Sequence, residues 1–199
     1  MIRIGLTGGI GTGKSTISLM LKEANFKIID ADVIAKEVLI KYPEILEKVR
    51  MEFGEGFFDW RGNFRRKEFG NHIFRFPKQR LKYEDIILPY IKNEIITSMK
   101  EFEDKGEKVV IVDAPTLIET KLHEEMDYVV LVSCDSSTQI QRIKTRDNLS
   151  NNDALNRINA QMSLEKKKNF ANIIIDNSKD LLYAKEQVDD FIDFINRVI

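Results

Sequence analysis

The chain has 199 residues and a formal net charge of −1, with 43% hydrophobic and 32% charged residues. This balance is ordinary for a soluble domain and argues against a nucleic-acid binder that relies on bulk positive charge. The one cysteine, Cys134, excludes an intrachain disulfide and a cysteine metal cluster, and we expect it to be a small core residue. No apolar run approaches the ~20 residues of a membrane span, and no signal peptide precedes the first motif, so we expect a cytoplasmic protein.

The first predicted elements are a strand, a glycine-rich loop and a helix. Residues 2–6 alternate and end apolar, as a short buried strand should, and residues 14–24 carry apolar side chains at helical spacing. Between them, Gly8 to Ser15 read G-G-I-G-T-G-K-S, which fits the phosphate-binding pattern G-x-x-x-x-G-K-[ST] at every fixed position. A glycine-rich turn alone would explain the glycines, but loop and context together predict a nucleotide site at a helix N-terminus.

The residue types of this phosphate loop suit a polyphosphate. Backbone N–H groups can surround a β-phosphate only where no Cβ atom blocks the approach. Lys14 would place its charge between the β- and γ-phosphates, and Ser15 would offer a hydroxyl to Mg²⁺. We expect Lys14 to face solvent when no nucleotide is bound. The predicted nucleotide contacts are Gly9, Ile10, Gly11, Thr12, Gly13, Lys14, Ser15 and Thr16.

Four further apolar runs are predicted to be strands, at residues 27–29, 109–112, 128–132 and 173–175. Such continuous β-branched runs suit a parallel sheet that is buried on both faces, and ligands bind beyond the carboxyl ends of its strands. The sequence therefore predicts an α/β protein of three layers around a five-stranded parallel sheet.

Helices are predicted after the last two of these strands and between them. Ser136 or Ser137 can cap a helix that runs to about Arg146, and Ser150 with Asp153 resembles the capping box of the next helix, residues 154–162. A final helix over residues 179–198 is predicted to point these side chains toward the core: Leu182, Val188, Phe191, Ile192 and Ile195.

Two segments interrupt the alternation of strands and helices. Residues 34–105 show helical patterns without a convincing buried strand, and they suit an acceptor-binding insertion or a helical subdomain that packs its own core. Residues 142–168 carry Arg142, Arg146 and Arg157, which could form a solvated face or a mobile lid over a triphosphate.

Carboxylates follow two of the predicted strands. Asp30 and Asp32 lie at and just past the end of the second strand, where we expect them beside the loop of the first strand. Either could accept a proton from an acceptor hydroxyl, hold a metal-bound water, or cap the helix that follows. Asp113 ends the third strand and could support Mg²⁺ through water.

The ordered set of motifs resembles the dephospho-CoA kinase family along nearly the whole chain. A phosphate loop alone is shared by many functions, whereas this combination is specific. The segments that carry the resemblance are residues 5–16 with 29–35, the acceptor segment Arg61 to Arg66 with Ile73-Phe74, the D-x-P-L-L-F-E-like residues 112–119, the lid residues from Arg142 to Ser163, and Asp176-Asn177-Ser178.

The resemblance implies a P-loop kinase fold with a helical acceptor-binding insertion and a helical lid. It implies that ATP and Mg²⁺ are used to phosphorylate the 3′-hydroxyl of the ribose of dephospho-CoA, the last step of coenzyme A synthesis. The implied site residues are Asp32 as base, Lys14, Arg142 and Arg146 as further catalytic groups, Asn177 near the adenine, Asp32, Arg66 and Arg157 on the substrate, and Ser15 and Asp113 (through water) for the metal.

Three positions depart from the family pattern. Leu88-Pro89 stands where the family usually has His-Pro, and Thr116 and Ile118 replace a leucine and a phenylalanine. The apolar neighbours of Leu88 favour a packing role for it. Another P-loop small-molecule kinase, such as a nucleoside monophosphate kinase, is the alternative function. A regulatory GTPase is disfavoured because no N-K-x-D motif is present, and a module that only binds nucleotide would not need the base and the lid arginines together.

Overall fold

Five parallel strands form the framework of the larger of two units in a computed structural model that describes residues 1–199, apart from the side chain of Phe74. This unit comprises Met1–Asp30 with Ser98–Ile199, and the second unit comprises Ala31–Thr97. The strands are β1 Ile2–Gly8, β2 Lys27–Asp30, β3 Val109–Asp113, β4 Tyr128–Ser133 and β5 Ile173–Asp176. Each predicted strand is therefore present.

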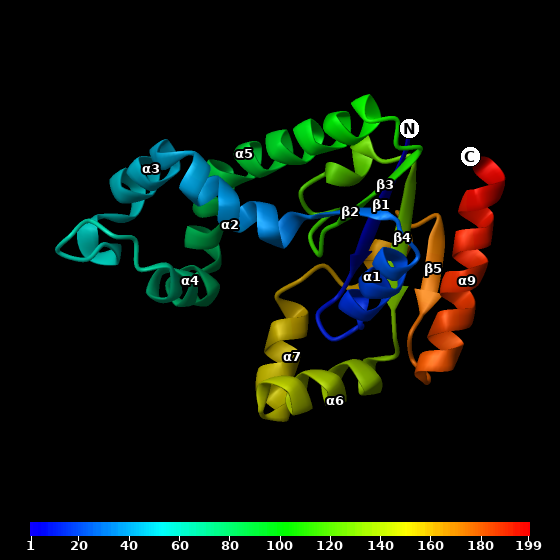
Figure 1. Ribbon diagram of the computed structural model, residues 1–199. Helices are drawn as coiled ribbons and strands as arrows, with labels where there is room; N and C mark the ends of the chain where they lie inside the picture. The colour runs from blue at the N-terminus through cyan, green and yellow to red at the C-terminus, as the bar shows by residue number, and fades with distance from the viewer. The chain divides into compact units, whose positions relative to one another are not determined.

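The order of the strands in the sheet is β2-β3-β1-β4-β5 (Figure 1). β1 is the central strand and pairs with β3 and β4, so β2 does not neighbour β1. The expectation that Asp30 lies directly beside the loop of the first strand is therefore wrong. Asp30 is instead in register with Asp113 on β3, at the same carboxyl edge.

The helices of the larger unit follow the strands as a parallel sheet requires, because each crossover must return the chain to the amino ends of the strands. They are α1 Lys14–Glu23, the 3-10 helix η2 Leu122–Glu125, α6 Ser136–Asp147, α7 Asn151–Asn159, α8 Leu164–Lys168 and α9 Leu181–Val198. No helix within the described residues is long and apolar enough to cross a membrane.

Both faces of the sheet are covered. On one face, Ile4 and Leu6 of β1 join a core with Ile17 of α1 and Val188 of α9. Side chains alternate between the faces of a strand, so the fully buried Val110 on β3 lies on the opposite face from its buried neighbours Val109 and Ile111. Burial on both faces explains why the strands read as continuous apolar runs.

The helices of the larger unit differ from the prediction in three details, two at helix starts and one in burial. Asp135, not Ser136 or Ser137, caps α6, because its side chain accepts a hydrogen bond from the backbone N–H of Thr138. Ser150 caps α7 as predicted, although the helix begins at Asn151. In α9, Leu182 is 72% exposed and does not reach the core, whereas the other four predicted side chains are buried or partly buried.

The second unit is helical. It comprises α2 Ala31–Lys41, α3 Pro43–Phe53, η1 Glu55–Phe57, α4 Arg66–Arg75 and most of α5 Pro77–Asp104. Phe69 is its buried aromatic centre, with ring centroids 5.0 Å from both Phe53 and Tyr83. The only strand-like feature among its described residues is an isolated bridge between Phe58 and Phe64. Of the predicted acceptor segment, the side chain of Phe74 lies outside the described residues.

Candidate active site

The phosphate loop joins β1 to α1 at the carboxyl edge of the sheet, where strand ends of a parallel sheet hold ligands. Gly11 and Gly13 have φ angles of 77° and 84°, which side chains other than glycine rarely adopt. A Cβ atom on Gly13 would also lie 2.1 Å from Nδ2 of Asn177. The glycine is therefore needed both for the turn and for the close approach of Asn177.

The carbonyl oxygen of Thr12 anchors the loop to two other elements. It accepts hydrogen bonds from Nδ2 of Asn177 at 2.8 Å and from a guanidinium nitrogen of Arg142 at 3.4 Å. Asn177 directly follows β5 and is 5% exposed, and Arg142 lies on α6. The structure therefore brings both predicted residues to the phosphate loop, where they hold its backbone. Contact of Asn177 with the adenine stays a prediction.

Lys14 forms an ion pair with Asp113, and the two side chains are 14% and 7% exposed. The expectation that Lys14 faces solvent is therefore wrong, because a buried carboxylate lies within reach at the end of β3. The pair joins the predicted cation of the phosphate loop to the predicted metal-supporting carboxylate. A phosphate that drew Lys14 toward itself would leave Asp113 available for another cation.

The remaining predicted metal and base residues are exposed. Ser15 lies in the first turn of α1, and Asp30 ends β2 in register with Asp113. Asp32 lies in the first turn of α2, in the second unit, and its role as base stays a prediction. No group of three metal-ligating side chains is present among the described residues. A hydroxyl with one carboxylate nevertheless suits Mg²⁺, which usually binds few protein oxygens together with substrate phosphates and water.

The other arginines of the predicted lid meet at one carboxylate. Both oxygens of Asp147 accept from Arg146, at 2.8 and 3.0 Å, and Arg157 donates to Asp147 at 2.5 Å. The hydrogen bonds from Arg146 hold the pKa of Asp147 below its usual value. Arg142 and Arg146 lie one helical turn apart on α6, but they have different partners.

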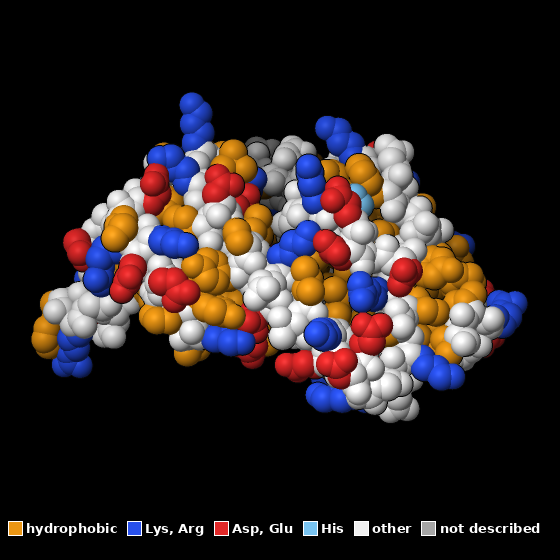
Figure 2. Space-filling model, turned by 90° about the horizontal axis from the view of Figure 1, so that it is seen from above, with side chains coloured by type: hydrophobic (Ala, Val, Ile, Leu, Met, Phe, Trp, Pro, Cys, Tyr) orange, Lys and Arg blue, Asp and Glu red, His pale blue; other side chains and the backbone are white. Residues whose placement is uncertain are grey.

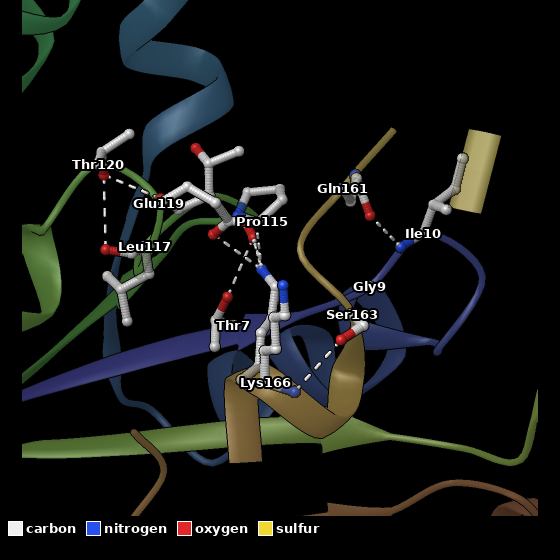
Figure 3. A network of polar contacts seen from close by, with 12 residues as sticks. Thr7, Gly9, Ile10, Pro115, Leu117, Glu119, Thr120, Gln161, Ser163 and Lys166 are labelled. Atoms are coloured by element: carbon white, nitrogen blue, oxygen red, sulfur yellow. Dashed lines mark hydrogen bonds and ion pairs between the residues drawn. The ribbon is translucent and has the colours of Figure 1, made fainter. Parts of the chain in front are cut away.

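Two glutamines hold the peptide groups of Ile10 in the phosphate loop. Gln161, after α7, accepts from the Ile10 N–H at 2.8 Å (Figure 3), and Gln139, on α6, donates to the Ile10 carbonyl at 2.7 Å. Gln139 is 5% exposed and was not predicted. Its position one helical turn before the buried Ile143 is the signal that could have indicated an inward-facing polar side chain.

A cavity of about 680 Å³ lies between the phosphate loop and the end of the predicted lid. Its lining includes Gly9 of the loop, both glutamines, and Asp176 at the end of β5. The volume is in the range of small-molecule sites, which combine apolar walls with a few polar groups.

Lys167 at the end of α8 is a further residue that the sequence analysis missed. Its side chain is fully buried, and its ammonium group contacts Pro115 and Glu119. Burial lowers its pKa. In the sequence, the run Lys166-Lys167-Lys168 is typical of a solvated helix end. For that reason the burial of Lys167 was not predicted.

In the second unit, Arg66 begins α4 with an exposed side chain. Its charge partly opposes the burial that raises the pKa of the nearby Tyr83 to about 12. The predicted acceptor contact of Arg66 stays a prediction, as do the boundaries of the insertion and the lid.

Comparisons with known proteins agree with these motifs. A family model described as dephospho-CoA kinase matches residues 2–182. Proteins named dephospho-CoA kinase are similar over most of their length: that of Clostridium perfringens is 62% identical over 98% of each chain, and that of Clostridium tetani is 52% identical over 98% of this chain and 86% of its own. The solved structure of dephospho-CoA kinase from Campylobacter jejuni has a TM-score of 0.74 at 26% identity, covering 98% of this chain and 97% of its own. This chain belongs to the dephospho-CoA kinase family.

Proposed function

We propose that this protein transfers the γ-phosphoryl group of ATP to the 3′-hydroxyl of dephospho-CoA, giving coenzyme A and ADP in the last step of coenzyme A synthesis. The observation that carries the proposal is the 62% identity to the Clostridium perfringens enzyme along 98% of both chains. The phosphate loop, its Lys14–Asp113 pair and the nearby arginines supply the chemistry that such a transfer needs.

The proposed reaction breaks the bond between the γ-phosphorus and the oxygen that bridges it to the β-phosphate, and it forms a bond to the 3′-oxygen. Lys14 leaves Asp113 to bind the β- and γ-phosphates, and Arg142 and Arg146 neutralise the charge that develops on the transferred group. Asp32 accepts the proton of the 3′-hydroxyl. Arg66 and Arg157 bind the acceptor, and Asn177 contacts the adenine of ATP.

Mg²⁺, when bound, would neutralise charge on the β- and γ-phosphates. Ser15 and Asp113 are the residues we propose to hold it, Asp113 through a water molecule. We further propose that residues 34–105 receive dephospho-CoA, that residues 142–168 close as a lid, and that the protein works in the cytoplasm, where ATP is abundant.

An ADP-release assay tests the proposed function directly. Purified protein with Mg²⁺ and ATP is given dephospho-CoA, adenosine monophosphate, cytidine monophosphate or no acceptor. We expect turnover with dephospho-CoA to exceed that with every other acceptor by orders of magnitude, and phosphorus NMR of the product to show a new 3′-phosphomonoester. Preferential turnover of a nucleoside monophosphate would instead support the alternative kinase class.

A further inference from the structure

Lys167 is a buried cation at the junction between the predicted lid and the segment that follows β3. Its side chain is 0% exposed, and among the described side chains Asp113 is the only other charged one that is buried. Burying an ammonium group is costly unless its charge is paired and its protons are bonded. A lysine that only ended a surface helix would not be placed here.

The ammonium group donates two hydrogen bonds, to the Pro115 carbonyl and to the Glu119 carboxylate, with which it also forms an ion pair. It lies 2.6 Å from the carbonyl oxygen of Pro115 and 2.9 and 3.0 Å from the two carboxylate oxygens of Glu119, whose side chain is 24% exposed. Burial is the main cause that lowers the pKa of Lys167, and the charge of Lys14 adds to the effect. The hydrogen bond to Glu119 opposes this lowering of the pKa.

The Pro115 carbonyl is shared with the strand that leads into the phosphate loop. The Thr7 hydroxyl donates to it at 3.1 Å, and Thr7 is the residue before Gly8 (Figure 3). The neighbouring backbone is fixed to the same strand, because the Ala114 N–H donates to the Leu6 carbonyl at 3.0 Å. The chain that leaves Asp113 is therefore held between β1 on one side and Lys167 on the other.

We propose that Lys167 is a positioning residue that couples the last helix of the lid to the Asp113–Glu119 segment and so sets the orientation of the Asp113 carboxylate beside Lys14. The inference rests on the proposed phosphoryl transfer and on residues 142–168 acting as a lid. Glu119 neutralises the buried charge of Lys167, and the hydrogen bond to Pro115 transmits its position.

The two parts of this arrangement can be separated by four variants. Lys167→Met keeps much of the side-chain volume and removes the cation, and Glu119→Gln removes only the carboxylate charge. The double variant Lys167→Met/Glu119→Gln leaves no unpaired charge at this position, but it lacks the hydrogen bond to the Pro115 carbonyl. Lys166→Met is the matched control, since Lys166 is exposed on the same helix.

The measurements are thermal unfolding, ATP affinity by calorimetry, and kcat and KM with dephospho-CoA. We expect Lys167→Met to lower kcat by at least about tenfold, the lower end of the loss seen when a residue that orients a metal ligand is removed, with little change in KM for dephospho-CoA. The double variant should recover most of the lost thermal stability but not kcat. Glu119→Gln should lose less turnover than Lys167→Met, and Lys166→Met should resemble wild type.

Recovery of kcat together with stability in the double variant would overturn the proposal, because the lysine would then be a structural ion-pair partner only. If neither Lys167→Met nor the double variant folds, the proposal is overturned in the same way. The proposed function is tested separately by the wild-type protein: if wild type does not phosphorylate dephospho-CoA, that function fails whatever Lys167 does.

Discussion

Polar side chains around the phosphate loop bind backbone groups, whereas those on the outer lid helices bind one another at the surface. Asn177 and Gln139 are each 5% exposed and donate to the carbonyls of Thr12 and Ile10. Arg146 and Arg157, with side chains 59% and 37% exposed, converge on Asp147. On the face shown in Figure 2, blue and red side chains are likewise interspersed, without a large field of one sign.

The difference indicates which parts of the site are fixed and which can rearrange. A buried carbonyl that loses its donor carries a desolvation penalty of ~1–3 kcal/mol, so the loop contacts are costly to break. An exposed ion pair contributes about 0–1 kcal/mol, and a phosphate can replace its carboxylate at small cost. The phosphate loop is therefore preorganised before nucleotide binds, whereas the outer arginines can change partners when substrate binds.

Substitution of Lys14 tests the buried contacts around the phosphate loop, and it should have the largest effect on turnover. Lys14→Met removes a charge aimed at the transferred group, so we expect turnover to fall by about 10³-fold. It also leaves the buried carboxylate of Asp113 without its cation. The free energy of unfolding should therefore fall by ~1–3 kcal/mol, unlike that of a simple solvent-facing lysine.

Turnover by ADP release and unfolding by denaturant on the same samples check this expectation. Lys22→Met is the control, because Lys22 is exposed on the same helix. Unchanged stability of a folded Lys14→Met protein would show that the pair with Asp113 contributes nothing, and near-normal turnover would refute the role of the phosphate loop.

Substitution of Asp32, the proposed base, should have the second largest effect. Asp32→Asn removes a carboxylate that accepts the hydroxyl proton, so kcat should fall by ~10²-fold or more while ATP affinity stays nearly constant. Steady-state kinetics with calorimetric ATP titration measure the two separately. Asp30→Asn is the matched control in the same short segment, and a larger effect there would exchange the two roles.

Arg142 and Arg146 sharpen the comparison because they lie one turn apart on one helix but have different partners. Arg142→Ala should lower turnover by about tenfold, equivalent to ~1.4 kcal/mol, and should also lower the melting temperature, since the Thr12 carbonyl loses a donor. Arg146→Ala should lower turnover without changing the melting temperature, because it releases only an exposed pair. Equal melting losses would contradict the division into fixed and exchangeable contacts.

Leu88→His should have the smallest effect. Leu88 is partly buried on α5 next to the buried Ile87, so a packing role predicts that the histidine brings no gain in acceptor binding. KM for dephospho-CoA should stay within about threefold of wild type, which is less than the ~1 kcal/mol of an ordinary hydrogen bond. A folded variant with a clearly lower KM and unchanged ATP kinetics would show that the position contacts the acceptor.

The strands and the phosphate loop could be predicted because each depends on local sequence. The run Val109 to Val112 is apolar at every position, and the loop has fixed glycines. The order of strands could not be read in this way, since it depends on how crossovers pack on the sheet, and so Asp30 was placed beside the wrong neighbour. Asp135 was missed as a cap because two serines follow it, and both aspartate and serine commonly cap helices.

Site residues could be predicted where a residue type in its motif has one common role. They could not be predicted where the role depends on which way the side chain points in the folded protein. Lys14 in its motif has one common use, but its pairing with Asp113 required the adjacency of β1 and β3. Lys167 lies in a run of three lysines, and only the orientation of a five-residue helix decides which of them turns inward. Residues that act through burial leave little trace in a single sequence.

The single thiol of the chain provides a built-in reporter for this edge of the molecule. Cys134 is 7% exposed, its sulfur lies 4.0 Å from the Gly11 carbonyl, and burial raises its pKa to about 11. Because only the thiolate is an effective nucleophile, alkylating reagents should modify Cys134 slowly in the folded protein. Its rate of alkylation would therefore report how often the end of β4 opens to solvent. A nucleotide that stabilises the adjacent phosphate loop should slow this alkylation, and no engineered probe is needed to measure it.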